Sequence, residues 1–138
     1  VIGYAIGKTL SPALTISALK DAISKRNTDS VIYHSDQGFQ YCSSRYVEIL
    51  KGKSISISMS EKANPYDNAK MESFFRILKV EEVYMGEYNT YEDVLFSIPY
   101  FIEEVYNKKR LHSSLGYMPL EEFEEKFNKN KSHQLVLI

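Results

Sequence analysis

The sequence has almost no cysteine, no long hydrophobic run and no excess of one charge. A lone Cys42 cannot form a disulfide within the chain or a cysteine-rich zinc site, which fits the reducing cytoplasm. We interpret it as a small core residue rather than a nucleophile. The longest apolar run, residues 94–102, is far shorter than the roughly 20 residues that a membrane span needs. The composition therefore predicts a soluble protein without a membrane span.

The charges nearly balance, with 17 lysines and arginines against 18 aspartates and glutamates and a net charge of −1. A strongly basic domain would indicate a nucleic-acid partner, so the overall charge by itself argues against one. The charges are unevenly spread, however. Residues 108–110 form a basic cluster, and glutamates gather after residue 102, where we interpret them as solvated faces of helices.

A length of 138 residues fits one domain, and its first part predicts alternating strands and helices. Ser11 followed by Pro12 is a favoured start for a helix, and Gly52 is placed to end a second helix in the left-handed conformation. Residues 55–59 alternate apolar residues with serine, as expected of a strand with one buried face. The order predicts an α/β sheet covered by helices. We expect strands at 1–6, 31–33 (buried) and 55–59, and helices at 12–25 and 43–52.

After a loop at 60–66, a third helix is expected to begin at Asp67 or Asn68. Its apolar residues recur at helical spacing and predict one buried face. The members of that face are Met71, Phe74, Phe75 and Leu78.

Two further helices complete the predicted organisation. Thr90 and Asp93 resemble a capping box that starts the first of them. Pro99 falls inside this helix, where it removes one backbone hydrogen bond and predicts a kink. The last helix is expected from Pro119 and is followed by a loose polar tail at 128–133. It is expected to pack through Phe123 and Phe127.

Asp36 and Glu72 are the candidate catalytic residues. Asp36 follows the strand at 31–33, Glu72 lies on the third helix, and 35 residues separate them. A strand end and a neighbouring helix can bring two carboxylates close enough to share Mg²⁺ ions, which prefer oxygen ligands. The alternative is that both are ordinary N-cap or surface acids, because a chain with 18 acidic residues holds some pair at any chosen spacing.

Polar residues share one face of the helix that carries Glu72. At about 100° per residue, the side chains of Asn68, Glu72, Arg76 and Lys79 form a narrow stripe opposite the apolar face. One interpretation is an amphipathic helix with an ion pair between Glu72 and Arg76. The other is a metal-binding carboxylate flanked by groups that hold phosphates, and only this one explains the polar loop, ANPYDNA, before the helix.

Three longer segments resemble a known family. They are HSDQGFQY at 34–41, NPYDNAKMESFFRILKVE at 64–81 and YNKKRLHSSLGYMPLEEFE at 106–124. In this order they resemble bacterial insertion-sequence transposases of the third insertion-sequence family, whose catalytic core is similar to retroviral integrase. The resemblance covers nearly the whole chain. It implies a DDE-type integrase core with a ribonuclease-H-like fold, in which a mixed sheet is flanked by helices.

The resemblance assigns roles to individual residues. In the family, two aspartates and a glutamate bind two divalent metal ions, Mg²⁺ or Mn²⁺. Asp36 matches the second aspartate and Glu72 matches the glutamate. Lys79 matches a basic residue that contacts DNA near the active site, and we assign Arg76 and Asn68 to the same DNA-binding face.

Three other residues are weaker candidates. Arg110 and His112 belong to the third segment, where packing is as good an interpretation as contact with DNA. His34 lies beside Asp36 in the first segment. It is either a metal ligand or base, or a hydrogen-bonded structural histidine, which is the commoner role because Mg²⁺ prefers oxygen.

The family's first aspartate has no match in this chain, since neither Asp21 nor Asp29 lies at the corresponding place. By the order of elements, residues 1–6 correspond to the third strand of the fold, so the first two strands are expected to be missing. We therefore expect residues 1–6 to pair with the strand at 31–33 or with a second chain, in a homo-oligomer.

The resemblance implies metal-dependent cleavage and transfer of DNA strands, with transposon ends and target DNA as partners. We assign residues 1–127 to a partial catalytic core and 128–138 to a C-terminal tail, and we expect this chain alone to be inactive. One alternative is a non-catalytic remnant that binds DNA or associates with itself. Another is a ribonuclease-H-like nuclease that hydrolyses without joining, because such folds host several reactions.

Overall fold

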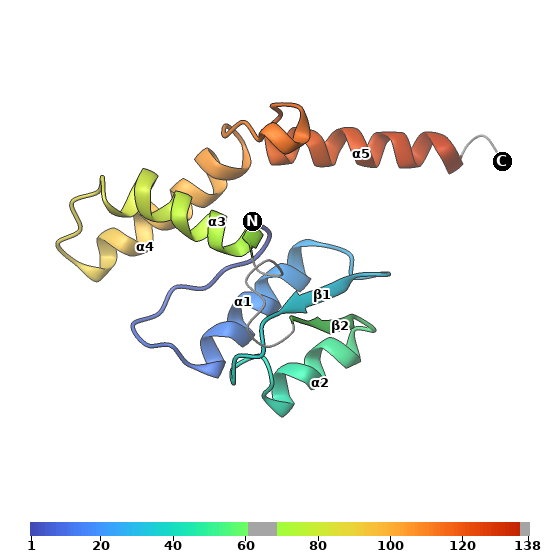
Figure 1. Ribbon diagram of the computed structural model, residues 1–138, viewed down its shortest axis with the longest axis horizontal. Helices are drawn as coiled ribbons and strands as arrows, with labels where there is room; N and C mark the ends of the chain where they lie inside the picture. The colour runs from blue at the N-terminus through green and yellow to red at the C-terminus, as the bar shows by residue number, and fades with distance from the viewer. Residues whose placement is uncertain (61–68, 136–138) are drawn as a thin grey trace. The chain divides into compact units, whose positions relative to one another are not determined.

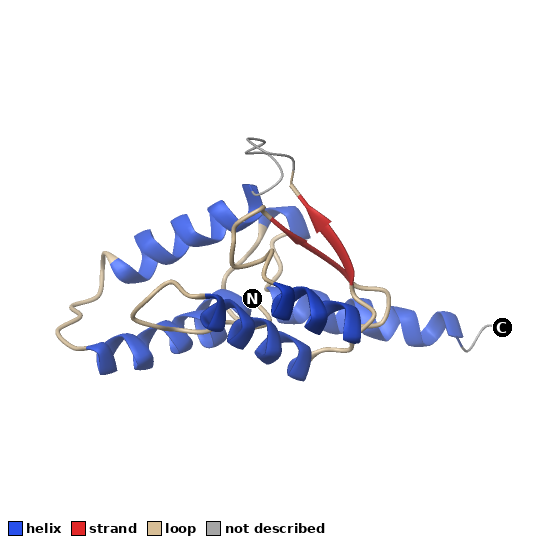
Figure 2. Cartoon of the chain, turned by 90° about the horizontal axis from the view of Figure 1, so that it is seen from below, coloured by secondary structure: helices blue, strands red, loops and turns tan. Residues whose placement is uncertain are grey.

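The computed structural model describes residues 1–60 and 69–135 (Figure 1). The chain divides into two compact units: an N-terminal unit, Ile2–Ile77, and a C-terminal unit, Leu78–Ile138 together with Val1. Both strands that the described residues form lie in the N-terminal unit, and the remaining regular structure is helical (Figure 2). Within the described part of the chain, no helix is long and apolar enough to cross a membrane.

The helix α1, Pro12–Lys25, begins and packs as the sequence predicts. The Ser11 hydroxyl oxygen accepts a hydrogen bond from the Leu14 backbone nitrogen at 3.3 Å, and Pro12 occupies the first turn. Ile16 and Leu19 are buried on one face of the helix. The apolar face of α1 therefore forms one wall of the core.

A β-α-β arrangement follows α1. The strands β1, Ile32–Ser35, and β2, Ser56–Met59, pair in parallel, and the helix α2, Ser44–Gly52, connects them. The predicted order of strand, helix and strand is confirmed. The prediction of a buried β1 is wrong, because Ile32 is 70% exposed. Tyr33, on the opposite face of the strand, does pack against the core. Successive side chains of a strand point to opposite faces, and the described residues cover only the face that carries Tyr33.

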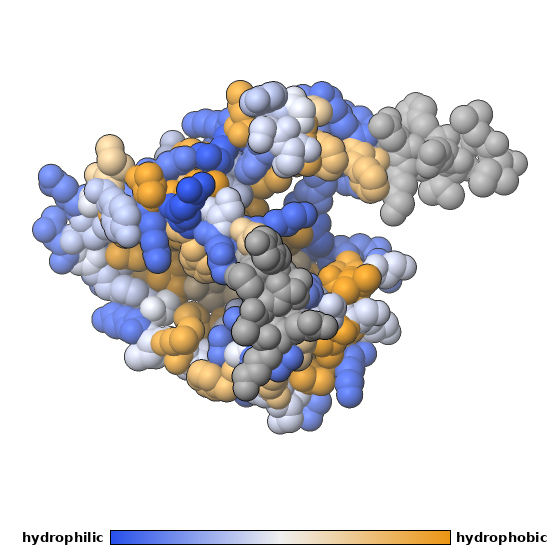
Figure 3. Space-filling view, in the orientation of Figure 1, coloured by the Kyte–Doolittle hydropathy of each residue, from blue (hydrophilic) through white to orange (hydrophobic). Residues whose placement is uncertain are grey.

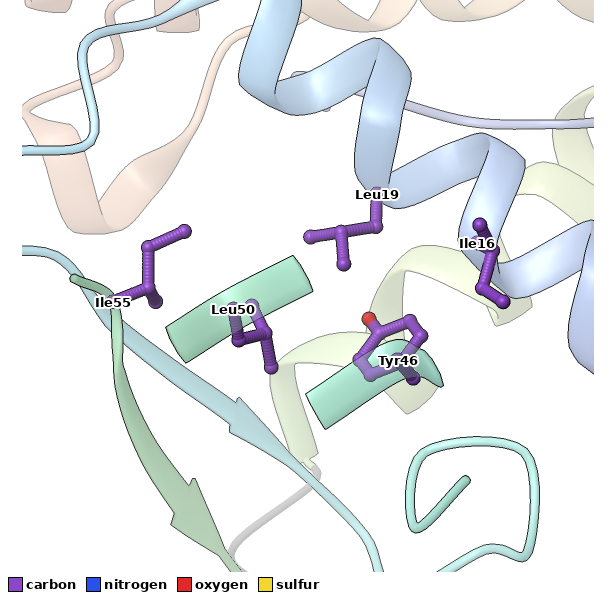
Figure 4. Packing of buried hydrophobic residues seen from close by; sticks show 5 residues of the cluster. All are labelled: Ile16, Leu19, Tyr46, Leu50 and Ile55. Carbon is purple, nitrogen blue, oxygen red and sulfur yellow. The ribbon is translucent and has the colours of Figure 1, made fainter. Parts of the chain in front are cut away.

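The core of the N-terminal unit joins α1, α2 and the residue before β2 (Figure 4). Tyr46 and Leu50, one turn apart on α2, are its most completely buried side chains. The rings of Tyr33 and Tyr41 pack edge-on against Tyr46, with centroids 5.7 Å and 5.6 Å away. Burial of one leucine-sized side chain contributes about 1.5–3 kcal/mol, so this cluster stabilises the unit. Its buried members are Ile16, Leu19, Tyr46, Leu50 and Ile55.

Residues 1–6 do not form the predicted strand. Gly3 and Tyr4 lie instead against α1, where a side chain on Gly3 would stand 2.4 Å from the Ala22 backbone nitrogen. The Tyr4 nitrogen donates to the Asp21 carboxylate at 3.3 Å, so the helix satisfies a donor that a sheet would otherwise bind. The expected pairing of this segment with β1 is therefore wrong, while pairing with a second chain stays a prediction.

Two smaller predictions in the N-terminal unit are also wrong. Gly52 is the last residue of α2, and the left-handed conformation falls two residues later at Ser54, with a φ of 55°. Cys42 is exposed in the turn before α2 rather than part of the core, and its Sγ lies 3.8 Å from the Gln37 carbonyl oxygen.

The helix α3, Ala69–Leu78, continues directly into a π-helix, η2, at Lys79–Val83. The helix that the sequence predicts here is thus confirmed over its described length. The predicted start at Asp67 or Asn68, and the predicted loop apart from Ser60, lie outside the described residues.

The face of α3 that the sequence predicts to be buried is only partly covered. Met71 and Phe75 are 57% and 48% exposed, while Phe74 and Leu78 are half-buried. The rings of Phe74 and Phe75 contact each other, with centroids 5.4 Å apart. Exposed apolar side chains are not confined to α3. Figure 3 shows hydrophobic residues among hydrophilic ones on the face of the molecule in view.

Thr90 and Asp93 form the predicted capping box at the start of α4, Tyr91–Tyr100. The Thr90 hydroxyl oxygen accepts from the Asp93 nitrogen at 3.2 Å, and the Asp93 carboxylate accepts from the Thr90 nitrogen at 2.8 Å. Pro99 lies inside α4, and two residues later the hydrogen bonding widens into the π-helix η3, Phe101–Asn107. Ile98, Phe101 and Ile102 are buried at this junction.

The last helix, α5, Leu120–Leu135, follows a short 3-10 turn, η4, at Ser113–Leu115. It begins beside Pro119 as predicted, but it continues through 128–133, where the sequence predicts a loose tail. Ion pairs between residues four apart support exposed helices, and Lys126 pairs with Glu122 at 2.7 Å in this way. Phe123 and Phe127 keep large exposed fractions, so they pack less than expected. The division into a core at 1–127 and a tail at 128–138 stays a prediction.

Candidate active site

Asp36 directly follows β1, where the chain turns away from the sheet. Its Oδ1 accepts a hydrogen bond from the Gly38 backbone nitrogen at 2.8 Å. The Gly38 carbonyl accepts in turn from the Tyr41 nitrogen at 2.9 Å, which closes the loop toward α2. The carboxylate is exposed, and no described residue binds its Oδ2. One oxygen is therefore held by the backbone and the other is open to a ligand.

His34 links the two strands beside Asp36. Its Nδ1 lies 3.0 Å from the Ser58 hydroxyl oxygen, and its Nε2 lies 3.1 Å from the Ser60 hydroxyl oxygen. Ser60 is buried, and its hydroxyl also donates to the Ser35 carbonyl at 3.3 Å. Both ring nitrogens of His34 are thus hydrogen-bonded to serines, Ser58 in β2 and Ser60 just after it. This favours a structural role for His34 over metal binding or proton transfer.

Three tyrosines, Tyr33, Tyr41 and Tyr46, pack together, and the charge of Asp36 acts on the pKa of Tyr33 and Tyr41. Burial raises the pKa of Tyr33, and the negative charge of Asp36 adds to the rise. Burial also raises the pKa of Tyr41, with smaller contributions from Tyr33 and Asp36. The pKa of Tyr46 is raised strongly, first by burial and then by its hydrogen bond with Tyr33. All three phenols therefore stay neutral around Asp36.

Glu72 lies in the first turn of α3, exposed and without a hydrogen bond or ion pair to any described residue. Arg76, four residues later, is exposed and equally unpaired within the described part of the chain, so the ion pair considered from the sequence is not formed. Lys79 is the exposed first residue of η2. Asn68 lies outside the described residues. The charged groups of this helix are therefore available to a ligand.

Asp36 and Glu72 both belong to the N-terminal unit. The segment that connects the end of β2 to α3 lies outside the described residues, and the convergence of the two carboxylates stays a prediction. Across the described residues, no three histidine, cysteine, aspartate or glutamate side chains are grouped so that they could hold a metal ion. The described residues thus offer two candidate carboxylates rather than a ready-made cluster of three.

Arg110, a weaker candidate from the third segment, pairs with Glu81 of η2. Its guanidinium contacts both oxygens of that carboxylate. Tyr106 lies beside this pair: burial raises the pKa of its phenol, Arg110 lowers it and Glu81 raises it. A guanidinium already bound to a carboxylate is less available to a phosphate, so the structure favours packing over DNA contact for Arg110.

Two other polar residues of the third segment, Asn107 and His112, also have contacts within their own unit. Asn107 binds the backbone of Val1 twice: its Oδ1 lies 2.5 Å from the Val1 nitrogen and its Nδ2 donates to the Val1 carbonyl at 2.8 Å. The His112 ring packs edge-on against Tyr106, with centroids 5.2 Å apart, and its buried Nε2 has no partner within the described structure. His112 therefore contributes to packing and is not exposed as a catalytic group.

Several residues that bind the candidate residues have no role in the sequence prediction. Ser58 and Ser60 bind His34, Gly38 binds Asp36 and Glu81 binds Arg110. Ser58 and Ser60 are two residues apart near the end of a predicted strand, which places them on one face, but only the register of β1 with β2 shows that His34 lies opposite. Nothing local in the sequence points from Arg110 to Glu81.

Two family models match the chain, and both are described as an integrase core domain. One matches residues 1–65 and the other matches residues 53–119, so together they cover most of the chain. The chain therefore belongs to the integrase core family.

The similar proteins come from bacterial insertion sequences. The transposase for insertion sequence element IS904 of Lactococcus lactis subsp. lactis (strain IL1403) is 38% identical over 129 residues, which are 93% of this chain and 51% of that protein. The insertion element IS600 uncharacterized 31 kDa protein of Shigella sonnei is 39% identical over 129 residues, or 93% of this chain and 47% of the relative. The transposase InsF for insertion sequence IS3A of Escherichia coli (strain K12) is 39% identical over 127 residues, or 91% and 44%. The chain thus spans about half the length of these relatives, and the resemblance to insertion-sequence transposases is confirmed.

Proposed function

We propose that this chain is part of the catalytic core of an insertion-sequence transposase, which cuts DNA strands and joins them to target DNA with divalent metal. The observation that carries the proposal is the exposed carboxylate of Asp36 at the end of β1, with one oxygen held and the other open. Relatives named as transposases match this chain over more than nine-tenths of its length. The fold that we propose is ribonuclease-H-like, and β1 and β2 supply two of its strands.

Asp36 and Glu72 fit Mg²⁺ or Mn²⁺ by the chemistry of their donor atoms. Both are exposed carboxylates, and no described cation neutralises either one. Such oxygens are the preferred ligands of these hard ions. Two bound ions would activate a water or a DNA 3′-hydroxyl and stabilise the leaving oxygen during attack on phosphorus. The part of Asp36 and Glu72 is to hold the ions in place, not to carry protons.

Phosphate binding falls to the basic residues that follow Glu72. Arg76 and Lys79 are exposed and free of ion pairs with described residues, and Asn68 is the third member of the proposed face. The N-terminal unit as a whole contains ten lysines and arginines against seven aspartates and glutamates. A basic unit attracts a polyanion such as DNA, which the nearly neutral charge of the whole chain conceals.

The proposed partners are the DNA ends of the element, the target DNA and further copies of the protein. We also propose assembly into a homo-oligomer, because exposed apolar edges recruit partners. A place in the cytoplasm fits the scarcity of cysteine. The non-catalytic remnant and the nuclease without joining activity remain outcomes of the test below.

The test is Glu72→Gln in the full-length protein. Because the substitution removes a ligand charge and keeps the shape of the side chain, Mg²⁺-dependent cleavage should fall to background while DNA binding is retained. Glu48→Gln is the control, since Glu48 is also an exposed helical glutamate of the N-terminal unit. Cleavage that survives Glu72→Gln would remove Glu72 from the site. Cleavage without strand transfer in the unchanged protein would identify a nuclease.

The 138-residue chain by itself should show no Mg²⁺-dependent cutting or joining of DNA, because none of its residues matches the family's first aspartate. DNA binding without cutting in every longer form of the protein would favour the non-catalytic remnant. Robust cutting by the 138 residues would contradict the assignment of the metal ligands.

A further inference from the structure

Gly38 lies directly beside the carboxylate of Asp36. Its nitrogen donates to Asp36 Oδ1 at 2.8 Å, and a Cβ added at Gly38 would stand 2.9 Å from the same oxygen. The added carbon would also stand 2.8 Å from the Gln40 Nε2. Separations below about 3.0 Å between such atoms are repulsive, so a side chain at position 38 would make the ends of both neighbouring side chains shift. Gly52 offers the contrast, because a Cβ there meets no atom within 4 Å.

We propose that Gly38 is a positioning residue for Asp36: its N–H holds Oδ1, and its missing side chain leaves room for the carboxylate to keep the orientation in which Oδ2 is open. This inference rests on the proposed role of Asp36 in binding metal. A carboxylate with one fixed oxygen presents the other in one direction, which reduces the rotational freedom that metal binding would otherwise remove. The absence of a side chain at Gly38 thus lets the Asp36 carboxylate keep this orientation.

The loop around Gly38 supports this assignment. The Gly38 carbonyl accepts from the nitrogens of Tyr41 and Cys42 at 2.9 Å and 3.3 Å, so the residue is held on both sides of its α-carbon. Its backbone lies outside the left-handed region, and alanine can adopt the same φ. The effect of Gly38→Ala should therefore come from the new methyl group and not from backbone strain. This makes the substitution a direct probe of the space beside Asp36.

The experiment titrates the 138-residue chain with Mn²⁺ alone and follows the paramagnetic broadening of its amide signals by NMR. We expect broadening around Asp36 in the unchanged chain and its loss in Asp36→Asn. Gly38→Ala should weaken Mn²⁺ affinity about 10-fold, the lower end of the range for residues that orient metal ligands. Gly52→Ala should leave the affinity unchanged. Thermal unfolding and the amide spectrum away from the loop confirm that each variant is folded.

A double variant separates the two neighbours of the new methyl group. In Gly38→Ala with Gln40→Ala, the contact with the glutamine is removed and the contact with Asp36 stays. Affinity should remain about 10-fold weaker, as in the single variant. Recovery of the affinity would show that Gln40 transmits the effect, and it would overturn the assignment of Gly38 to Asp36.

The remaining outcomes distinguish this inference from the proposed function. If Asp36→Asn abolishes the broadening while Gly38→Ala binds Mn²⁺ as tightly as the unchanged chain, the metal role stands and the inference on Gly38 fails. If Asp36→Asn has no effect, the metal role of Asp36 fails and takes the inference with it. Should Gly38→Ala not fold, hydrogen exchange of the Gly38 amide decides: slow exchange that Asp36→Ala accelerates supports the inference, and fast exchange in both chains overturns it.

Discussion

The charged residues of the sequence motifs are used differently in the N-terminal and C-terminal units. In the N-terminal unit, Glu72 and Arg76 are one helical turn apart and remain unpaired among the described residues, and Asp36 binds a backbone N–H. In the C-terminal unit, acidic residues outnumber basic ones by eleven to seven, and several have polar partners within the unit. These pairs are Glu81 with Arg110, Glu82 with Tyr88, Glu104 with Lys108, and Glu122 with Lys126. In this chain, Arg110 has a partner in its own unit and serves the fold. Glu72 and Arg76 have none among the described residues and are open to a ligand.

Core substitutions should have the largest effect, and they test whether the two units are separate. Leu50→Ala removes a side chain that is 1% exposed and should lower the free energy of unfolding of the N-terminal unit by about 2–5 kcal/mol. Phe101→Ala, at 3% exposure, should cost the C-terminal unit about 3–5 kcal/mol. Amide hydrogen exchange should accelerate mainly in the unit that carries the substitution. Equal acceleration in both units would show that they unfold together.

Substitutions of two basic residues, Arg110 and Lys79, should have effects of intermediate size. They test which of the two residues serves the fold and which binds DNA. Arg110→Ala leaves Glu81 without its partner and should lower the free energy of unfolding by up to about 1 kcal/mol, as expected for a largely solvent-screened pair. It should leave the salt dependence of DNA binding unchanged. Lys79→Ala should leave stability unchanged and reduce the slope of log affinity against log salt by about one unit. The opposite pattern would exchange their assigned roles.

The smallest effect is expected at the capping box of α4 and depends on pH. Hydrogen bonds from the backbone of Thr90 and Asn89 lower the pKa of Asp93. A carboxyl group whose pKa is lowered by folding stabilises the folded chain above its ordinary pKa, about 3.9, and this contribution is lost as the pH falls through the lowered value. Asp93→Asn should therefore lower the thermal midpoint at neutral pH, and the difference from the unchanged chain should shrink below about pH 4. Glu92→Gln is the control, and a difference independent of pH would contradict the cap.

The local features of the fold could be predicted because their causes lie within a few residues. The Ser11 cap and the Thr90 capping box depend on neighbours three residues away, and both are present. The alternation over residues 55–59 correctly gives β2, since period two requires no knowledge of the partner strand. Local patterns also place Asp36 after a strand and Glu72 on a helix. The family resemblance is what pairs these two distant residues as metal ligands.

The wrong predictions concern residues whose position or partner is set by residues far away in the sequence. Residues 1–6 have the apolar composition of a strand, but the close approach of Gly3 to α1 and the carboxylate of Asp21 place them along the helix. Ile32 is exposed because no described residue covers its face of β1. Arg110 is unavailable to DNA because it binds Glu81, 29 residues earlier. No periodicity within a single segment contains this information.

The two π-helical segments, η2 and η3, change the phase of the helices that they continue. A π turn closes its hydrogen bond over one more residue than an α turn, so the side chains that follow are rotated by about one residue, or roughly 100°, from an uninterrupted α-helix. A helical wheel drawn from Glu72 is therefore valid only as far as Lys79, where η2 begins. Shortening η2 by one residue would restore the α-helical phase and turn Glu81 away from Arg110. The length of this segment, and not only its composition, is thus a condition for the ion pair of the C-terminal unit.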